Sequence, residues 1–356
     1  GASAGTSIAT GVIFTLPALL ILGYWQDFRY SWVLAIAGLG GLLGVLFSVP
    51  LRRSLIVEQG LAFPEGKAAA EVLKTGDNPG AGLKILAGAA TLGGLMKLAA
   101  GSGLRLIPDT AASSAWWGNT LAYFGTNLSP ALFGVGYIVG LNIGIVMLAG
   151  GVIAWNVAIP IYSTFFLAAD PLLSVELAGA SAEDAAYGIW SAQIRYLGVG
   201  AMLIGGVWTL VSLRHSLVSG IRSGIHADRG NGGETIPATE RDLPTRLILL
   251  GLLMFTLPLM VLYQAIVGNW LVSIPMTVIM IVAGFLFVSV SAYMAGLVGS
   301  SNNPVSGLTI ATILFAALVL VFLLGADSPI GAVATIMIGA VVCGAACIGG
   351  DHLQDL

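Results

Sequence analysis

The sequence predicts an all-α fold: a polytopic integral membrane helical bundle of about ten transmembrane spans with broken or re-entrant segments. Hydrophobic residues make up 57% of the 356 residues and charged residues only 9%, whereas a soluble domain has roughly 25% charged residues. Mean hydropathy is +0.95, and apolar runs of membrane-crossing length recur along the chain. These observations exclude a soluble enzyme, a disordered chain and a disulfide-stabilised scaffold.

The apolar runs are the elements of this fold. Crossing roughly 30 Å of hydrocarbon at 1.5 Å per residue takes about 20 apolar residues. The third run is short and carries Lys97, and the eighth is long enough to be tilted or broken. The ten predicted spans lie near residues 7–24, 31–51, 83–101, 130–150, 151–169, 191–213, 247–267, 270–298, 305–325 and 329–349.

The charged segments between the spans predict how the chain crosses the membrane. Segments 52–84 and 214–246 hold ten Lys and Arg residues, against three in the segments assigned to the opposite side. Basic loops favour the cytoplasm, and four predicted spans separate the two segments. We therefore expect both segments to be cytoplasmic and the protein to lie in the cell membrane, plasma or inner.

Aromatic residues gather in the predicted loop 102–129, which holds Trp116, Trp117 and Tyr123. Trp and Tyr concentrate at membrane–water interfaces. We expect this loop to anchor the protein at the outer interface.

Composition also predicts a division of the chain. Residues 214–246 are polar and Gly-rich, with no apolar run, which is typical of a linker. We expect a first helical bundle at 1–213, which carries an amphipathic segment at 58–76 on the cytoplasmic side. The linker 214–246 then leads to a second, truncated bundle at 247–356.

The most specific polar motif, residues 300–307, lies between two apolar spans and includes Asn302, Asn303, Pro304, Ser306 and Gly307. Pro304 removes a backbone donor and disfavours helix at Asn303. Opened backbone at membrane depth is tolerated where it lines a polar cavity, and such breaks bind substrates in transporters. A plain cytoplasmic turn explains the same spacing equally well.

Three carboxylates in and beside the amphipathic segment, Glu58, Glu65 and Glu71, are candidate proton acceptors. Pro64 suits the first position of a helix, and Glu71 can pair with Lys74 one turn later. The segment is a short helix that lies against the membrane or re-enters the bundle. A solvated helix without function is the alternative, and composition alone favours it.

Few polar residues lie inside the apolar spans, and Asn142, Tyr162 and Tyr293 are the candidates for a substrate pathway. Asn142 sits among Gly residues spaced four apart, a pattern that lets helices approach closely. Interhelical packing is therefore an alternative role for Asn142. For Tyr162, which follows Pro160, the simpler expectation is a helix kink.

Near the end of the chain, Cys343, Cys347, Asp351, His352 and Asp355 resemble a loose metal-ligand set. Their spacing matches no structural zinc pattern, and small apolar packing explains the cysteines better. No phosphate-binding Gly-rich motif is present in the sequence, so an ATP-driven pump is unsupported. We expect no metal, no cofactor and no enzymatic activity.

Several motifs resemble the oligopeptide transporter (OPT) family, which includes the yellow stripe-like metal-chelate transporters. The matching residues run in order along the whole chain: 11–18, the Pro-Glu-Gly block at 62–73, the Asn-Pro-Val-Ser-Gly block at 302–310 and the Gly-Gly-Asp block at 349–356. Family members are much longer, so the resemblance implies a middle portion of such a protein.

The resemblance implies a secondary active transporter, a proton-coupled symporter of small oligopeptides or metal-chelator complexes. Asn302, Asn303, Pro304, Ser306 and Gly307 would form a broken segment near the substrate. A passive channel or facilitator for a small polar solute also fits the scarcity of ionisable residues. The expected partners are the substrate, protons and the lipid bilayer. A homo-oligomer is a further candidate partner. The net charge of −3 gives no basic surface for binding nucleic acid.

Overall fold

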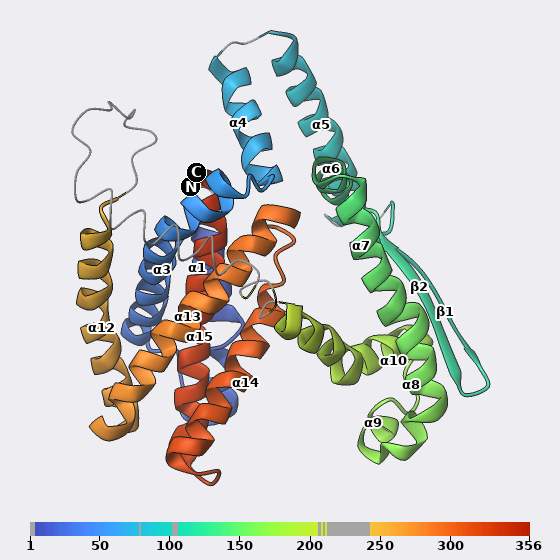
Figure 1. Cartoon of the computed structure of the whole chain (residues 1–356). Coiled ribbons are helices and arrows are strands. Elements are labelled where there is room, and N and C mark those ends of the chain that lie inside the picture. Colours follow the sequence, from blue (N-terminus) through green and yellow to red (C-terminus); the bar gives the residue numbers. More distant parts are fainter. Residues whose placement is uncertain (1–3, 78–79, 102–105, 206–207, 209–210, 212–242) are drawn as a thin grey trace. The chain divides into compact units, whose positions relative to one another are not determined.

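The structure is a computed structural model that describes residues 4–77, 80–101, 106–205, 208, 211 and 243–356 (Figure 1). These residues are predominantly helical and form two compact units. The first unit comprises Gly1–Phe63 with Ala201–Leu356, and the second comprises Pro64–Gly200. The all-α membrane fold is confirmed, since seven helices are long and apolar enough to cross a membrane in the part of the chain described.

The first unit is built from apolar helices interrupted at prolines and glycines. Positive φ at Gly268, Gly299 and Gly325 ends three successive helices, a conformation that glycine adopts without strain. The elements are α1 (Ala4–Ile13), α2 (Pro17–Ile21), α3 (Tyr30–Arg52), the π-helical turn η1 (Arg53–Glu58), α12 (Thr245–Val267), α13 (Trp270–Val298), α14 (Val305–Leu324) and α15 (Pro329–Asp355).

Helix α15 is the buried centre of the first unit, with 78% of its most apolar window inside the protein. It contacts α1, α3, α13 and α14 (Figure 1). Small residues allow the backbones to approach closely. A Cβ added at Gly44 of α3 would lie 2.5 Å from the Ala345 carbonyl oxygen, and one at Gly11 of α1 would lie 2.7 Å from the Gly344 Cα.

The second unit combines helices with a β-hairpin. Its helices carry many exposed apolar side chains, and only 6% of the window in the helix Leu141–Phe165 is buried. The elements are α4 (Pro64–Asp77), α5 (Ala81–Gly101), β1 (Thr110–Trp117), β2 (Thr120–Asn127), α6 (Pro130–Val139), α7 (Leu141–Gly151), η2 (Val152–Ala158), α8 (Ile159–Phe165), η3 (Leu167–Ala169), α9 (Pro171–Glu176), α10 (Ala182–Ile189) and η4 (Trp190–Ile194).

The hairpin corrects the prediction that 102–129 is a loop. Strands β1 and β2 pair antiparallel, with Trp117 opposite Thr120. Gly118 begins the two-residue turn at φ 63°, and the following residue is Asn119. A Gly-Asn pair between β-prone residues is a hairpin signal. Tyr123 is buried, whereas Trp117 is exposed, and anchoring at the outer interface stays a prediction.

Three predicted spans have different boundaries in the structure. Gly140, at φ 89°, ends α6 after ten residues, and the helix Leu141–Phe165 then joins parts of the predicted spans 130–150 and 151–169. The predicted span 7–24 is a shorter apolar helix, Ile8–Ile21, with a turn before Pro17. The positive φ of Gly140 ends α6, and Pro17 begins α2. The apolar composition of these stretches does not reveal where either boundary falls.

The predicted span 191–213 and linker 214–246 extend into residues outside those described. The division at 214–246 and the cytoplasmic location of both charged segments therefore stay predictions.

Candidate functional site

The Asn-Pro break between α13 and α14 lines a pocket of about 460 Å³ at one end of the first unit. Helix α13 ends at Gly299, whose φ is 87°, and α14 begins at Val305. The chain between them supplies polar side chains and opened backbone to the wall. The lining residues are Thr10, Phe14, Ser300, Ser301, Asn303, Pro304, Val305, Ser306, Cys347 and Asp351.

Asn303 is held by a short chain of hydrogen bonds. Its Nδ2 donates to the Ser291 hydroxyl at 2.6 Å, and that hydroxyl donates to the Ala346 carbonyl at 2.7 Å. The carboxamide is thereby tied to both α13 and α15. Its Oδ1 is buried and accepts no hydrogen bond within the described part of the chain, which is unusual for a buried polar atom.

Gly350 makes room for this arrangement. A Cβ at Gly350 would lie 3.2 Å from the Asn303 Nδ2 and 3.4 Å from the Ser291 Oγ. Such contacts are tighter than ordinary van der Waals distance, so the asparagine would have to shift. The Gly-Gly-Asp sequence thus positions Asn303 as well as Asp351.

The last turns of α15 are polar but still packed. Asp351 is 7% exposed and lines the pocket. His352 takes a different direction, since its Nδ1 lies 2.6 Å from the Ser48 hydroxyl of α3. Gln354 donates from Nε2 to the Ala295 carbonyl. These bonds fix the end of α15 against α3 and α13.

Of the other predicted residues in the first unit, Asn302, Gly307 and Tyr293 are not among the pocket-lining residues. Asn302 donates from Nδ2 to the Val298 carbonyl at 3.1 Å and so caps the end of α13. Gly307 faces the Met202 side chain. Tyr293 packs partly buried against the apolar core. Their roles in a pathway stay predictions.

Asn142 and Tyr162 belong to the second unit. Asn142 is exposed near the start of α7, and a Cβ at Gly136 or Gly144 would meet nothing within 4 Å. No helix therefore packs on that glycine pattern among the residues described. Tyr162 donates its hydroxyl to Asp170 at 3.0 Å.

The three candidate proton acceptors lie in or beside ordinary surface helices. Glu71 pairs with Lys74 at 2.7 Å, with both side chains 71% exposed. Glu58 lies 3.8 Å from Arg53 at the end of η1. Glu65 is in the first turn of α4, which confirms the predicted helix start at Pro64. A role in proton coupling stays a prediction for all three.

The second unit has an aromatic cluster that links the hairpin to its helices. Trp155 lies 4.8 Å from Tyr123 and stacks on Trp190 at 5.7 Å, measured between ring centroids. Burial and the Tyr187 hydroxyl raise the pKa of Tyr123 to about 12. Trp155 and Trp190 lie in π-helical turns, a rare helix variant that occurs frequently at functional sites.

The two cysteines are buried in α15. The Cys343 Sγ lies 2.8 Å from the Thr309 hydroxyl, and Cys347 contributes to the pocket wall. No group of three or more His, Cys, Asp or Glu residues suited to a metal ion occurs among the residues described. Asp351 and His352 also do not converge, since one lines the pocket and the other contacts Ser48.

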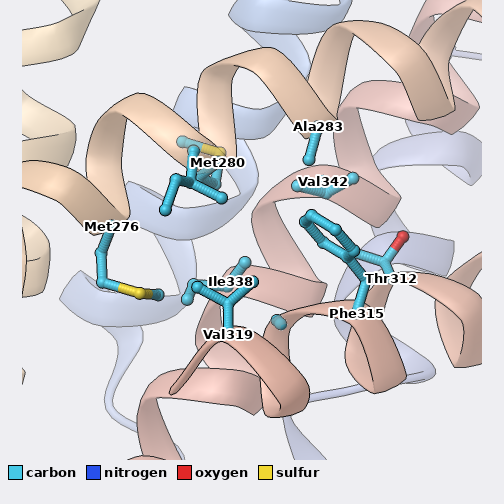
Figure 2. A pocket seen from close by; sticks show the side chains of 10 residues that line it. Met276, Met280, Ala283, Thr312, Phe315, Val319, Ile338 and Val342 are labelled. Carbon is cyan, nitrogen blue, oxygen red and sulfur yellow. The ribbon is translucent and has the colours of Figure 1, made fainter. Parts of the chain in front are cut away.

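A second space between the same helices is apolar and very small. It measures about 10 Å³ and is bounded by α13, α14 and α15 (Figure 2). Holding a single water takes about that volume and several polar partners. Thr312 is the polar residue in the wall, and its hydroxyl already donates to the Leu308 carbonyl. This space therefore offers little to a polar ligand.

Sequence reasoning missed Asp351 as a pocket residue. The predicted span ended at 349, which placed Asp351 outside the helix, whereas α15 continues to Asp355. An ionisable residue at the end of a long apolar helix is itself a signal of function. The helical pattern at 329–355, followed through its glycines, could have revealed it. Thr10 and Phe14 carried no such signal.

The chain matches the family model described as OPT oligopeptide transporter protein over residues 1–356. A protein of Haemophilus influenzae that is provisionally named an oligopeptide transporter is 34% identical across 99% of this chain. The chain spans 57% of that relative's length. No solved structure matches the chain. Its apolar helices, its broken segment and this match together identify it as an integral membrane protein that belongs to the oligopeptide transporter family.

Proposed function

We propose that the full-length protein is a secondary active transporter that moves small oligopeptides or metal-chelator complexes together with protons. The observation that supports this most strongly is the pocket at the α13–α14 break, lined by Asn303, Pro304 and Ser306. Its volume of about 460 Å³ falls within the range of small-molecule sites, about 300–1,000 Å³. We propose that substrate binds there.

The chemistry of the pocket wall suits a peptide. The first N–H groups of an α-helix have no intrahelical partners, and α14 begins at Val305 in the wall. The Val305 N–H already donates to the Asn303 carbonyl at 2.7 Å, so the donor that we propose for a substrate carbonyl or carboxylate is the Ser306 hydroxyl. Asp351 lines the same pocket and supplies a carboxylate acceptor. A peptide carries both kinds of group.

Proton coupling is the finer part of the proposal. Glu58, Glu65 and Glu71 are the proposed acceptors, and a single Glu→Gln change at the coupling residue would abolish accumulation driven by a proton gradient. Uptake that ignores an imposed gradient would instead favour the facilitator. We also propose that exposed apolar helix faces in the second unit are covered by lipid or by a second copy.

The test is uptake by the full-length protein in proteoliposomes, with labelled di- to tetrapeptides and iron–chelate complexes, with and without a proton gradient. Asn303→Ala should lower uptake at least about tenfold because it removes the carboxamide from the pocket. Asn269→Ala is the matched control, since Asn269 caps the opposite end of α13. Wild-type uptake by Asn303→Ala would separate the pocket from transport.

A further inference from the structure

The pocket at the α13–α14 break combines polar groups with one large apolar side chain. Most of its lining residues are small or polar, and Phe14 is the aromatic residue among the ten described residues that line it. Phe14 is 51% exposed, whereas Cys347 in the same wall is 3% exposed. Pro304 and Val305 are smaller and partly buried. Among the lining residues, Phe14 therefore leaves the most apolar surface uncovered.

The backbone at Phe14 is held by its neighbours in the chain. Its N–H donates to the Thr10 carbonyl at 3.1 Å, which continues the last turn of α1. The hydroxyl of the next residue, Thr15, donates to the Gly11 carbonyl at 2.7 Å, and Thr15 is buried. Gly11 lies against Gly344 of α15, where an added Cβ would come within 2.7 Å. Phe14 is thus fixed beside α15 while its ring stays uncovered, which limits the ordering cost when a ligand packs on it.

The neighbouring residue Ile13 shows what sets Phe14 apart. Ile13 is 65% exposed, and it is not among the residues that line the pocket. Lipid can cover such a side chain, since lipid tails are as apolar as the side chain itself. The apolar core of the first unit uses Leu16 and Leu19 from the same stretch of chain. The pocket, rather than the core, is therefore the place where the Phe14 ring can meet a ligand.

We infer that Phe14 is a specificity-determining residue that packs against an apolar side chain of the transported peptide. A polar space of about 460 Å³ has both the room and the partners for water. A ligand that covers the Phe14 ring removes apolar surface from that water, which favours binding. The Ser306 hydroxyl in the same wall can bond to the peptide main chain, which all peptides share, and so does not select among side chains. This inference rests on the proposed function, because it names the part of the substrate that is selected.

The experiment measures uptake by the full-length protein in proteoliposomes. The substrates are trialanine and its derivatives with leucine or asparagine at one position, tested at each position in turn. Leucine and asparagine side chains have similar size and shape, so the comparison isolates polarity. Wild-type protein should prefer leucine by at least about fivefold at one position or more. Phe14→Ala should reduce this preference to within about twofold, because it removes most of the apolar surface. Ile13→Ala, the matched truncation outside the pocket, should keep the wild-type preference.

The outcomes separate the inference from the proposed function. Trialanine uptake by wild type with equal uptake of leucine and asparagine peptides at every position would overturn the inference alone, as would an unchanged preference in Phe14→Ala. An equal loss of preference in Ile13→Ala would refute the assignment to Phe14. No uptake of trialanine by wild type would overturn peptide transport and the inference with it. Phe14→Leu keeps a large apolar side chain and should retain most of the preference, and its loss would contradict the inference even if Phe14→Ala does not fold.

Discussion

Two regions of the same three-helix contact differ in what they hold. Around Ile338 and Val342, helices α13, α14 and α15 leave an apolar gap of about 10 Å³ (Figure 2). About two turns further along α15, Cys347 and Asp351 border a polar pocket of about 460 Å³, whose other walls are the α13–α14 break, the start of α14, Thr10 and Phe14. The helix α15 is common to both, so its own shape does not explain the difference.

The difference comes from the segments that face α15, above all the chain between α13 and α14, together with Thr10 and Phe14 at the polar pocket. In the apolar region α13 and α14 are regular helices, with Met276 and Met280 facing Phe315 and Val319 across the gap. In the polar region the chain between them, from Gly299 to Pro304, is not helical. These six non-helical residues thus replace a packed core with a site whose backbone groups can form hydrogen bonds outside a helix. Variants that disturb one region and spare the other test this contrast.

The largest expected effect is Gly44→Ala, which strikes the α3–α15 contact that supports both regions. The new Cβ would lie 2.5 Å from a backbone oxygen and 3.0 Å from the Ile348 Cβ, and backbone cannot yield as a side chain can. We expect destabilisation of about 3 kcal/mol or more, measured as loss of folded protein on heating in detergent. Gly38→Ala on the same helix meets nothing within 4 Å and should be harmless; equal losses would contradict the packing.

Ile338→Ala should damage the apolar region alone. Ile338 is 4% exposed, so its truncation should cost about 2–4 kcal/mol of stability. Because the gap is apolar and far smaller than a substrate, the KM for uptake by the protein that remains folded should stay unchanged. A raised KM would show that the two regions are coupled and would weaken the contrast.

Gly350→Ala should damage the polar region with little loss of stability. The added methyl forces the Asn303 amide to shift by a few tenths of an ångström, which should reduce uptake by about tenfold or less, since misplacement by a fraction of an ångström is felt at a binding site. Gly331→Ala on the same helix is the control, because its Cβ would meet only the Ser328 side chain, at 3.7 Å. Normal uptake by Gly350→Ala would remove Asn303 positioning from the account.

Thr312→Val should have the smallest effect. The hydroxyl bonds only to the Leu308 carbonyl one turn earlier, and the gap it borders holds no partner for it. Stability should change by less than about 1 kcal/mol and uptake should not change. A large loss of uptake would indicate that the apolar gap takes part in transport.

The membrane fold and the position of the break could be predicted from sequence because each depends on local residues. Apolar runs of about 20 residues define the long helices, and Pro304 stops helix formation wherever it occurs. The start of α4 at Pro64 is predictable for the same reason. The hairpin could also have been found, since Gly118 and Asn119 are strong local turn signals.

The composition of the pocket wall could not be predicted, because it depends on contacts between distant parts of the chain. Thr10 and Phe14 come from α1 and the residue after it, and nothing in their neighbourhood indicates a site. The predicted span ends at 349, before Asp351, because a polar residue after an apolar run is typical of the end of a membrane helix, whereas α15 continues to Asp355. The bond from Asn303 to Ser291 also joins residues twelve positions apart on either side of a helix end.

We expect the region at the α13–α14 break to be open to water and substrate, whereas the neighbouring gap is too small and too apolar to admit either. Cysteine accessibility in the full-length protein tests this most directly, with Ser306→Cys and Thr312→Cys on the same helix and all other cysteines replaced by serine. A water-soluble, membrane-impermeant thiol reagent should label position 306, transported substrate should protect it, and position 312 should stay unlabelled. Equal labelling of both positions, or none at 306, would contradict the claim.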